Sequence, residues 1–255
     1  IARANEEVVR ANTEKDEAIA NEAREDLAAR DQEMAQTRNA LAAALMPLGE
    51  AEWKQYFGDV RSAPPLPSDI ATILDGPCPF WPNKKVRDTH LLVLIPATVN
   101  GVPFTLNRLE ELIKYSSNGG HRTEYRCYNE RVKAQIGEQS PPHSYWLLMT
   151  RDVLPGGRNK VYTAQKELVA TYASQGYALP SGLEAATAIL THHAREGARL
   201  FGDDPCTYTR CLDVDEDGDP VVVGGFSSGG LRVYHIRKPL CRHHRNHCDG
   251  VSCLR

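Results

Sequence analysis

The spacing of hydrophobic and polar positions indicates one long helix in the first 46 residues. Glycine and proline are absent there, and Ala, Glu, Arg, Asp and Asn predominate. Ile1 and Val8 are seven residues apart, as are Leu27 and Met34, but the two pairs are out of phase. A heptad with a phase slip, a weakly amphipathic stalk and a solvated single helix all fit this pattern. We expect residues 1–46 to form a helical stalk through which copies of the chain associate into a homo-oligomer.

Residues 47–87 are expected to be a Pro-rich linker. Prolines recur between residues 62 and 82, where charged residues are few, and such a composition favours an extended segment. Phe80 and Trp81 are large apolar side chains in this stretch, and we expect them to anchor it to a folded surface.

Residues 88–255 carry the short apolar runs and helical patterns of a compact α+β domain. The predicted strands are Leu91–Ile95, Ser144–Thr150, Cys206–Leu212 and Pro220–Gly224, and the predicted helices are Arg108–Lys114, Thr163–Ser174 and Leu183–Glu196. Asn100–Gly101 predicts a hairpin turn, Asn107 the N-cap of the first helix and Gly176 a left-handed C-cap after the second. Strands and helices do not alternate regularly, which argues against a parallel sheet.

Composition narrows the classes of function. The chain has 255 residues, of which 41% are hydrophobic and 25% charged, and no apolar run approaches the roughly 18 residues that a membrane span needs. No signal peptide is visible, so the expected location is the cytoplasm by default, or a phage or surface assembly. A net charge of −3 argues against a nucleic-acid partner. Seven scattered cysteines favour a reduced chain over a disulfide scaffold.

Two clusters resemble functional motifs but have simpler interpretations. Asp213, Asp215 and Asp217 begin like a calcium loop, yet the twelfth position is Gly224, which offers no carboxylate, so we expect an acidic hairpin tip. His192 and His193 come near the end of the third predicted helix, where cationic residues are favoured. We expect these two to be capping and surface residues, and we assign no chemistry to them.

The segment Arg232–Cys248 is the unusual part of the chain. It reads RVYHIRKPLCRHHRNHC, with five Lys or Arg residues, four histidines and no acid. Neither a period of two nor one of 3.6 fits it, so core packing does not explain the pattern. A surface loop or an exposed sheet face is the expected structure.

Two functional interpretations compete for this basic segment. Cys241, His243 or His244, His247 and Cys248 are zinc-ligand types, although the short Cys-x-x-Cys spacing of structural zinc sites is missing. Tyr, Arg and His are equally the residues that carry interface energy, which points to a recognition surface. We favour recognition and expect no metal or other cofactor.

Three short motifs resemble the C-type-lectin fold in the form found in formylglycine-generating enzymes. Tyr177–Ser181 with Glu184–Ala186 resembles the "(Y/W)RLPTEAEWE-A" start of that family's second helix, Gly224–Ser228 its "GGSW" strand, and Gly250–Arg255 its closing "GFR" or "VRCVR" strand. The resemblance implies a C-type-lectin-like domain over residues 88–255, preceded by the stalk. No position matches the oxidase's catalytic cysteine pair, so catalysis is not expected. A formylglycine-generating-enzyme-like oxidase and a zinc-stabilised interaction module remain the alternatives.

One subgroup of this fold, the variable proteins of diversity-generating retroelements, is similar in a further respect. These proteins place hypervariable positions between the "GG" strand and the last strand, and adenine-directed changes there do not give Glu, Gln, Trp or Met. Residues 233–253 contain none of these four residue types. Lys238 is not reachable by such changes and would be a fixed or differently encoded position.

The resemblance implies a hypervariable surface within residues 232–253 that binds a protein or another anionic ligand. The residues expected to display it outward from one face are Tyr234, His235, Arg237, Arg242, His243, His244, Arg245 and His247.

Overall fold

The computed structural model of the protein describes residues 19–21, 23–32, 47–61, 63–115, 119–127, 130–236 and 249–252. The chain divides into two compact units, Ile1–Met46 and Pro47–Arg255. In the first unit the described residues are helical and exposed. In the part of the chain described here, none of the helices combines the length and apolarity needed to cross a membrane.

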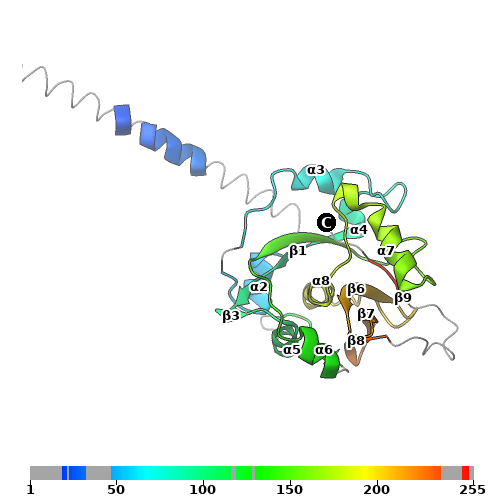
Figure 1. The fold of residues 1–255 in the computed structure, drawn as a ribbon. Helices are drawn as coiled ribbons and strands as arrows, with labels where there is room; N and C mark the ends of the chain where they lie inside the picture. The colour runs from blue at the N-terminus through cyan, green and yellow to red at the C-terminus, as the bar shows by residue number, and fades with distance from the viewer. Residues whose placement is uncertain are drawn as a thin grey trace, which may run out of the picture. The chain divides into compact units, whose positions relative to one another are not determined.

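The second unit mixes helices and strands, as predicted for an α+β domain (Figure 1). Its helical elements are α2 (Glu50–Tyr56), α3 (Ile70–Asp75), α4 (Val86–Thr89), α5 (Leu106–Lys114), α6 (Glu130–Ile136), α7 (Tyr162–Ala170), the 3₁₀ turn η1 (Ala173–Gln175) and α8 (Gly182–Glu196). Its strands are β1 (His90–Ile95), β2 (Thr98–Val99), β3 (Val102–Pro103), β4 (Tyr125–Cys127), β5 (Tyr145–Thr150), β6 (Tyr208–Val214), β7 (Pro220–Ser227), β8 (Gly230–His235) and β9 (Asp249–Gly250).

The strands form two main layers on either side of α8. β1 and β5 pair antiparallel, while the second sheet has the order β4-β8-β7-β6-β9. Within it β6, β7 and β8 are antiparallel neighbours, and both edge strands, β4 and β9, pair in parallel. Figure 1 shows α8 end-on between these layers, and it contacts β1 as well as β6, β7 and β8.

Helix α8 begins and ends at strong local signals. The Ser181 hydroxyl accepts a hydrogen bond from the Glu184 amide at 3.2 Å, and the Glu184 carboxylate accepts one from the Ser181 amide at 2.7 Å. This reciprocal capping box fixes the start, and Gly197 ends the helix with a left-handed conformation. Most of the helix is buried, and small residues such as Ala185 and Ala188 let both layers approach it closely.

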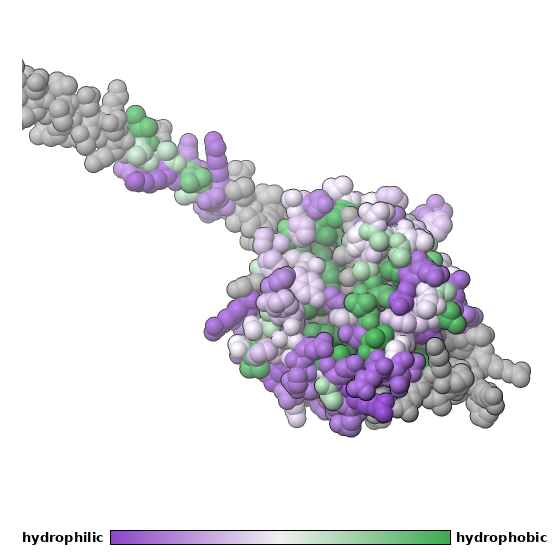
Figure 2. Space-filling view, viewed as in Figure 1, coloured by the Kyte–Doolittle hydropathy of each residue, from purple (hydrophilic) through white to green (hydrophobic). Residues whose placement is uncertain are grey.

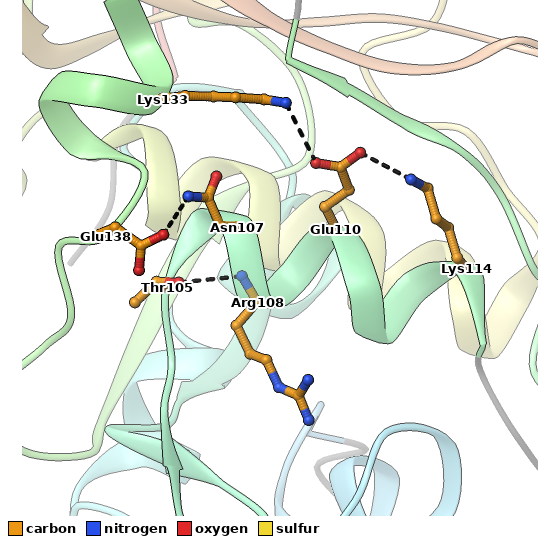
Figure 3. Close-up of polar contacts among 7 residues, drawn as sticks. All are labelled: Thr105, Asn107, Arg108, Glu110, Lys114, Lys133 and Glu138. Atoms are coloured by element: carbon orange, nitrogen blue, oxygen red, sulfur yellow. Dashed lines mark hydrogen bonds and ion pairs between the residues drawn. The ribbon is translucent and has the colours of Figure 1, made fainter. Parts of the chain in front are cut away.

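The other local predictions met mixed outcomes. The strands β1 and β5, the Asn100–Gly101 turn and the left-handed Gly176 are confirmed. The predicted cap of α5 was wrong, because the Arg108 amide donates to the Thr105 hydroxyl at 3.1 Å. Asn107 instead donates from its side chain to Glu138 (Figure 3).

Figure 3 also shows how α5 is tied to α6. The carboxylate of Glu110 lies between two ammonium groups, with Lys114 Nζ at 2.9 Å and Lys133 Nζ at 4.0 Å. Lys114 lies one turn along α5, while Lys133 comes from α6, so a single acid joins the two helices. These groups are partly exposed, and their contribution to stability is correspondingly small.

The expected linker over residues 47–87 belongs to the compact unit. Leu48 pairs with β1, donating from its amide to the Leu92 carbonyl at 2.8 Å and accepting from the Leu94 amide at 2.9 Å. Trp53 is buried in the same core, and its indole Nε1 donates to the Leu94 carbonyl at 3.0 Å. The linker prediction failed because Leu48 and Trp53, which pack into the core, precede the proline-rich stretch and are isolated apolar residues in the sequence. Phe80 is buried and Trp81 partly buried, as expected of anchors.

We predict that Trp53→Ala lowers the free energy of unfolding of the chain by roughly 3–5 kcal/mol, because it removes a buried aromatic side chain and a buried hydrogen bond. Lys54→Ala, on the exposed side of the same helix, is the control and should change it by less than about 0.5 kcal/mol. Urea denaturation measures both variants. Equal stability of the Trp53→Ala variant and the parent chain would show that residues 47–57 are not part of the core.

Candidate functional site

The outer face of the five-stranded sheet, opposite the core that contains α8, is the candidate site. On β8, Leu231 and Val233 belong to the core, whereas Arg232 is exposed and Tyr234 is half-buried. The start of the basic segment therefore follows a period of two, which the sequence analysis missed. The short alternation runs from Leu231 to His235.

Three outer-face side chains from β6 and β8, the two strands that flank β7, contact one another across it. The rings of Tyr208 on β6 and Tyr234 on β8 meet edge to face, with centroids 5.6 Å apart. Arg232 Nη1 donates to the Tyr208 hydroxyl at 3.4 Å. Burial raises the pKa of Tyr208, while hydrogen bonds with Arg232 and Tyr234 oppose that rise. The phenol therefore stays neutral near pH 7 and offers a hydrogen-bonding group beside a cation.

Two glycines on β7 make room for this arrangement. A Cβ atom on Gly225, which has a φ of +54°, would lie 2.1 Å from the Tyr208 hydroxyl oxygen. A Cβ atom on Gly224 would lie 2.3 Å from the Thr207 carbonyl oxygen. Glycine is thus required where the Tyr208 ring and the β6 backbone approach β7.

The chain on both sides of residues 237–248 is anchored to this sheet. Before them, the Ile236 amide donates to the Pro220 carbonyl at 3.3 Å. After them, the Leu154 amide donates to the Val251 carbonyl at 2.7 Å, and the Ser252 and Thr209 hydroxyls are 2.7 Å apart. None of these contacts uses a side chain from residues 237–248.

The predicted site residues divide into three groups. Tyr234 is half-buried and lies on the outer face. His235 does not, because strand alternation turns it to the inner side; it is 6% exposed, and its Nδ1 lies 3.3 Å from the Asp219 carbonyl oxygen. Lying outside the described residues are Arg237, Arg242, His243, His244, Arg245 and His247.

Sequence reasoning missed Tyr208 and the contact it makes with Arg232. Tyr208 lies on a strand that was predicted, but periodicity does not show which residue of another strand it faces. The signal that could have found it is the Gly224–Gly225 pair, since consecutive glycines in a strand indicate close approach of another group.

The acidic cluster forms a hairpin tip between β6 and β7, as predicted. The Asp215 carboxylate accepts hydrogen bonds from the amides of Asp217 at 3.1 Å and Asp219 at 2.8 Å. Among the described residues, no group of three or more His, Cys, Asp or Glu side chains could hold a metal ion. Cys241 and Cys248 of the zinc alternative lie outside those residues.

His192 and His193 are buried, so their prediction as surface residues was wrong. The helix-end argument assumed a helix on the surface, whereas α8 is covered on nearly all sides. His193 stacks against Phe226, with centroids 4.8 Å apart. Burial lowers the pKa of His192 to about 4, and the charges of Arg151 and Arg195 act in the same direction while Glu196 opposes them. Both histidines have packing roles.

Comparison of the chain with protein-family models, with curated proteins and with solved structures found no match.

We predict that Gly225→Ala destabilises the fold by more than its backbone conformation alone requires. Gly101→Ala is the matched control, because it also has a positive φ, +77°, but nothing lies within 4 Å of its added Cβ. The control should lose about 1–2 kcal/mol, and Gly225→Ala a further 1–3 kcal/mol for displacing Tyr208. Adding Tyr208→Ala to Gly225→Ala should remove part of the extra loss. Urea denaturation of Gly101→Ala, Gly225→Ala, Tyr208→Ala and the Gly225→Ala/Tyr208→Ala double variant measures this coupling. Equal losses in the two glycine variants would contradict the close approach.

We predict that acid destabilises the fold through His192. An unfolded histidine titrates near 6.5, so between pH 6.5 and 4 the unfolded chain binds a proton that the folded chain excludes. Stability is therefore complete above about pH 6.5 and falls by roughly 3 kcal/mol as the pH approaches 4. His192→Gln should flatten this part of the profile, while His143→Gln at an exposed site should not. Urea denaturation from pH 4 to 7 gives the free energy of unfolding at each pH. If this free energy depends on pH as steeply in His192→Gln as in the parent chain, the assignment to His192 is refuted.

Proposed function

We propose that the chain is a ligand-binding protein that displays a variable recognition surface on a C-type-lectin-like domain of the formylglycine-generating-enzyme type. In this proposal it is a variable protein of a diversity-generating retroelement. Tyr234, with Arg237, Arg242, His243, His244, Arg245 and His247, contacts the ligand, and the exposed Arg232 extends that surface, supported from below by the buried Tyr208. Its role is binding rather than catalysis.

The observation that carries the proposal is the anchoring of both ends of residues 237–248. Backbone bonds from Ile236 and Val251, and the Thr209–Ser252 hydroxyl pair, hold these ends without using any side chain from between them. A scaffold of this kind tolerates changes in the intervening residues, as recognition loops on rigid domains do.

The chemistry of the surface favours an anionic ligand. Arg232 is exposed beside Tyr208 and Tyr234, and residues 232–248 contain five Lys or Arg residues and no acid. Guanidinium groups bind carboxylates and phosphates through paired hydrogen bonds, and Tyr adds rigid contact area. An acidic protein surface is the expected partner.

The stalk adds a second element to the proposal. If residues 1–46 join several copies of the chain, each assembly presents several recognition surfaces at once. Linked sites raise the overall affinity without any new contact.

We predict that replacing Arg237, Arg242 and Arg245 with Ser weakens binding to poly-L-glutamate at least tenfold while leaving the melting temperature within about 2 °C, because interface energy concentrates in arginine and aromatic residues. The control replaces three exposed lysines elsewhere, Lys54, Lys84 and Lys160, with Ser, so that net charge changes equally. Fluorescence anisotropy measures binding, and scanning calorimetry measures stability.

Three further observations separate the alternatives. A large fall in melting temperature on chelation, reproduced by His247→Ser, would favour the zinc-stabilised module. Oxidation of a cysteine-containing substrate peptide by the parent chain would favour the oxidase. At the level of the gene, a near-copy of the segment for residues 224–255 that differs at adenines, beside a reverse transcriptase, is expected; its absence would contradict the retroelement origin.

A further inference from the structure

Strand β6 exposes large apolar side chains beyond the point where β9 covers it. Among the described residues, β9 pairs with Tyr208 and Thr209 of this strand. Further along, Cys211 is fully buried, but Leu212 is 61% and Val214 is 39% exposed. Cys211 faces the core and Leu212 faces away from it, as alternation requires, and the register of β6 against β7 shifts before Val214.

A third exposed apolar residue lies next to the strand. The Tyr162 hydroxyl donates to the Cys211 carbonyl at 2.7 Å, and Arg210 Nη1 donates to the Lys160 carbonyl at 2.8 Å. These bonds hold Val161, which is 67% exposed, beside β6. We call Val161, Leu212 and Val214 the β6 apolar surface. Gathered apolar residues of this kind mark interaction sites more often than single ones do.

An acidic border follows this surface directly in the chain. Glu216 and Asp217 are exposed at the hairpin tip, and the Asp215 carboxylate holds the tip in place through backbone amides. Asp217 faces Arg131 at 3.9 Å, and both side chains are well exposed, so this pair is weak. Figure 2 shows hydrophobic and hydrophilic residues side by side on the face of the compact unit turned to the viewer.

The β6 backbone here is not open for strand addition. The Leu212 amide donates to the Pro180 carbonyl at 2.8 Å, and the Cys211 carbonyl already accepts from Tyr162. A partner must therefore contact side chains rather than extend the sheet.

We propose that the β6 apolar surface and its acidic border bind a basic amphipathic segment of another protein. Apolar side chains of the segment pack on Leu212 and Val214, and its Lys or Arg residues lie opposite Glu216 and Asp217. Charge complementarity selects this partner, since an acidic segment would be repelled at the hairpin tip. None of these residues is in the variable set, so the inference stands apart from the proposed function.

The experiment uses the full chain and a labelled 14-residue peptide with Leu and Lys at helical spacing. Two comparison peptides replace all Lys with Glu or all Leu with Ser. Binding of the Leu/Lys peptide, followed by fluorescence anisotropy, should weaken about tenfold in the Leu212→Ser/Val214→Ser variant and about threefold in Glu216→Gln/Asp217→Asn. Val102→Ser, at an exposed apolar residue on β3, is the control and should bind as the parent does.

Several outcomes would overturn the proposal. Equal binding of the Leu/Glu peptide would show that charge does not select the partner. Undiminished binding by the Leu212→Ser/Val214→Ser variant would show that the β6 apolar surface is not the binding site. Light scattering that shows self-association of the parent, lost in that variant, would assign the surface to a second copy of the chain. Leu212→Lys, at an exposed position that a charge tolerates, repeats the test if the double variant fails to fold.

Discussion

The burial of α8 between two layers of strands is the constraint on which the domain depends. Eleven of its fifteen residues are buried, so nearly every side of the helix must be apolar, small or internally bonded. Thr187 and Thr191 meet this requirement by donating to carbonyls one turn earlier, at 2.6 and 2.7 Å. His192 meets it by remaining neutral. A charged or bulky replacement on α8 would disturb both layers together, because one helix supplies the inner wall of each.

This constraint also assigns different tasks to the two faces of the second sheet. The inner face packs against α8 and carries Val221, Val223 and Val233. On the outer face Arg232 is exposed and Tyr234 half-buried, so the packing of α8 does not depend on these two side chains. The glycine pair of β7 belongs to this outer arrangement, since it brings Tyr208 against the strand instead of filling the core.

Local patterns predicted the longer strands and helices, but they predicted little of how these elements pack together. β1, β5 and α8 were predictable because continuous apolar runs and a capping box are local signals. The buried positions of Trp53 and His192 were not, since each depends on what packs against its helix. His235 was misplaced for a related reason: five alternating residues are easily lost in a longer segment without a period. Which residue faces Tyr208 across the sheet is decided by register, and a single sequence does not show register.

The pairing of Leu48 with β1 has a mechanical consequence. Leu48 is the second residue of the compact unit, and its two backbone bonds join it in parallel to the central strand of a three-element layer. A pulling force applied at Pro47 would reach this pairing first. Two bonds loaded together along a strand share the force, and Trp53 behind them is held by the same strand through the Leu94 carbonyl. A pull at the start of the compact unit would therefore load this pairing before it deforms the sheet that carries Tyr208 and Arg232.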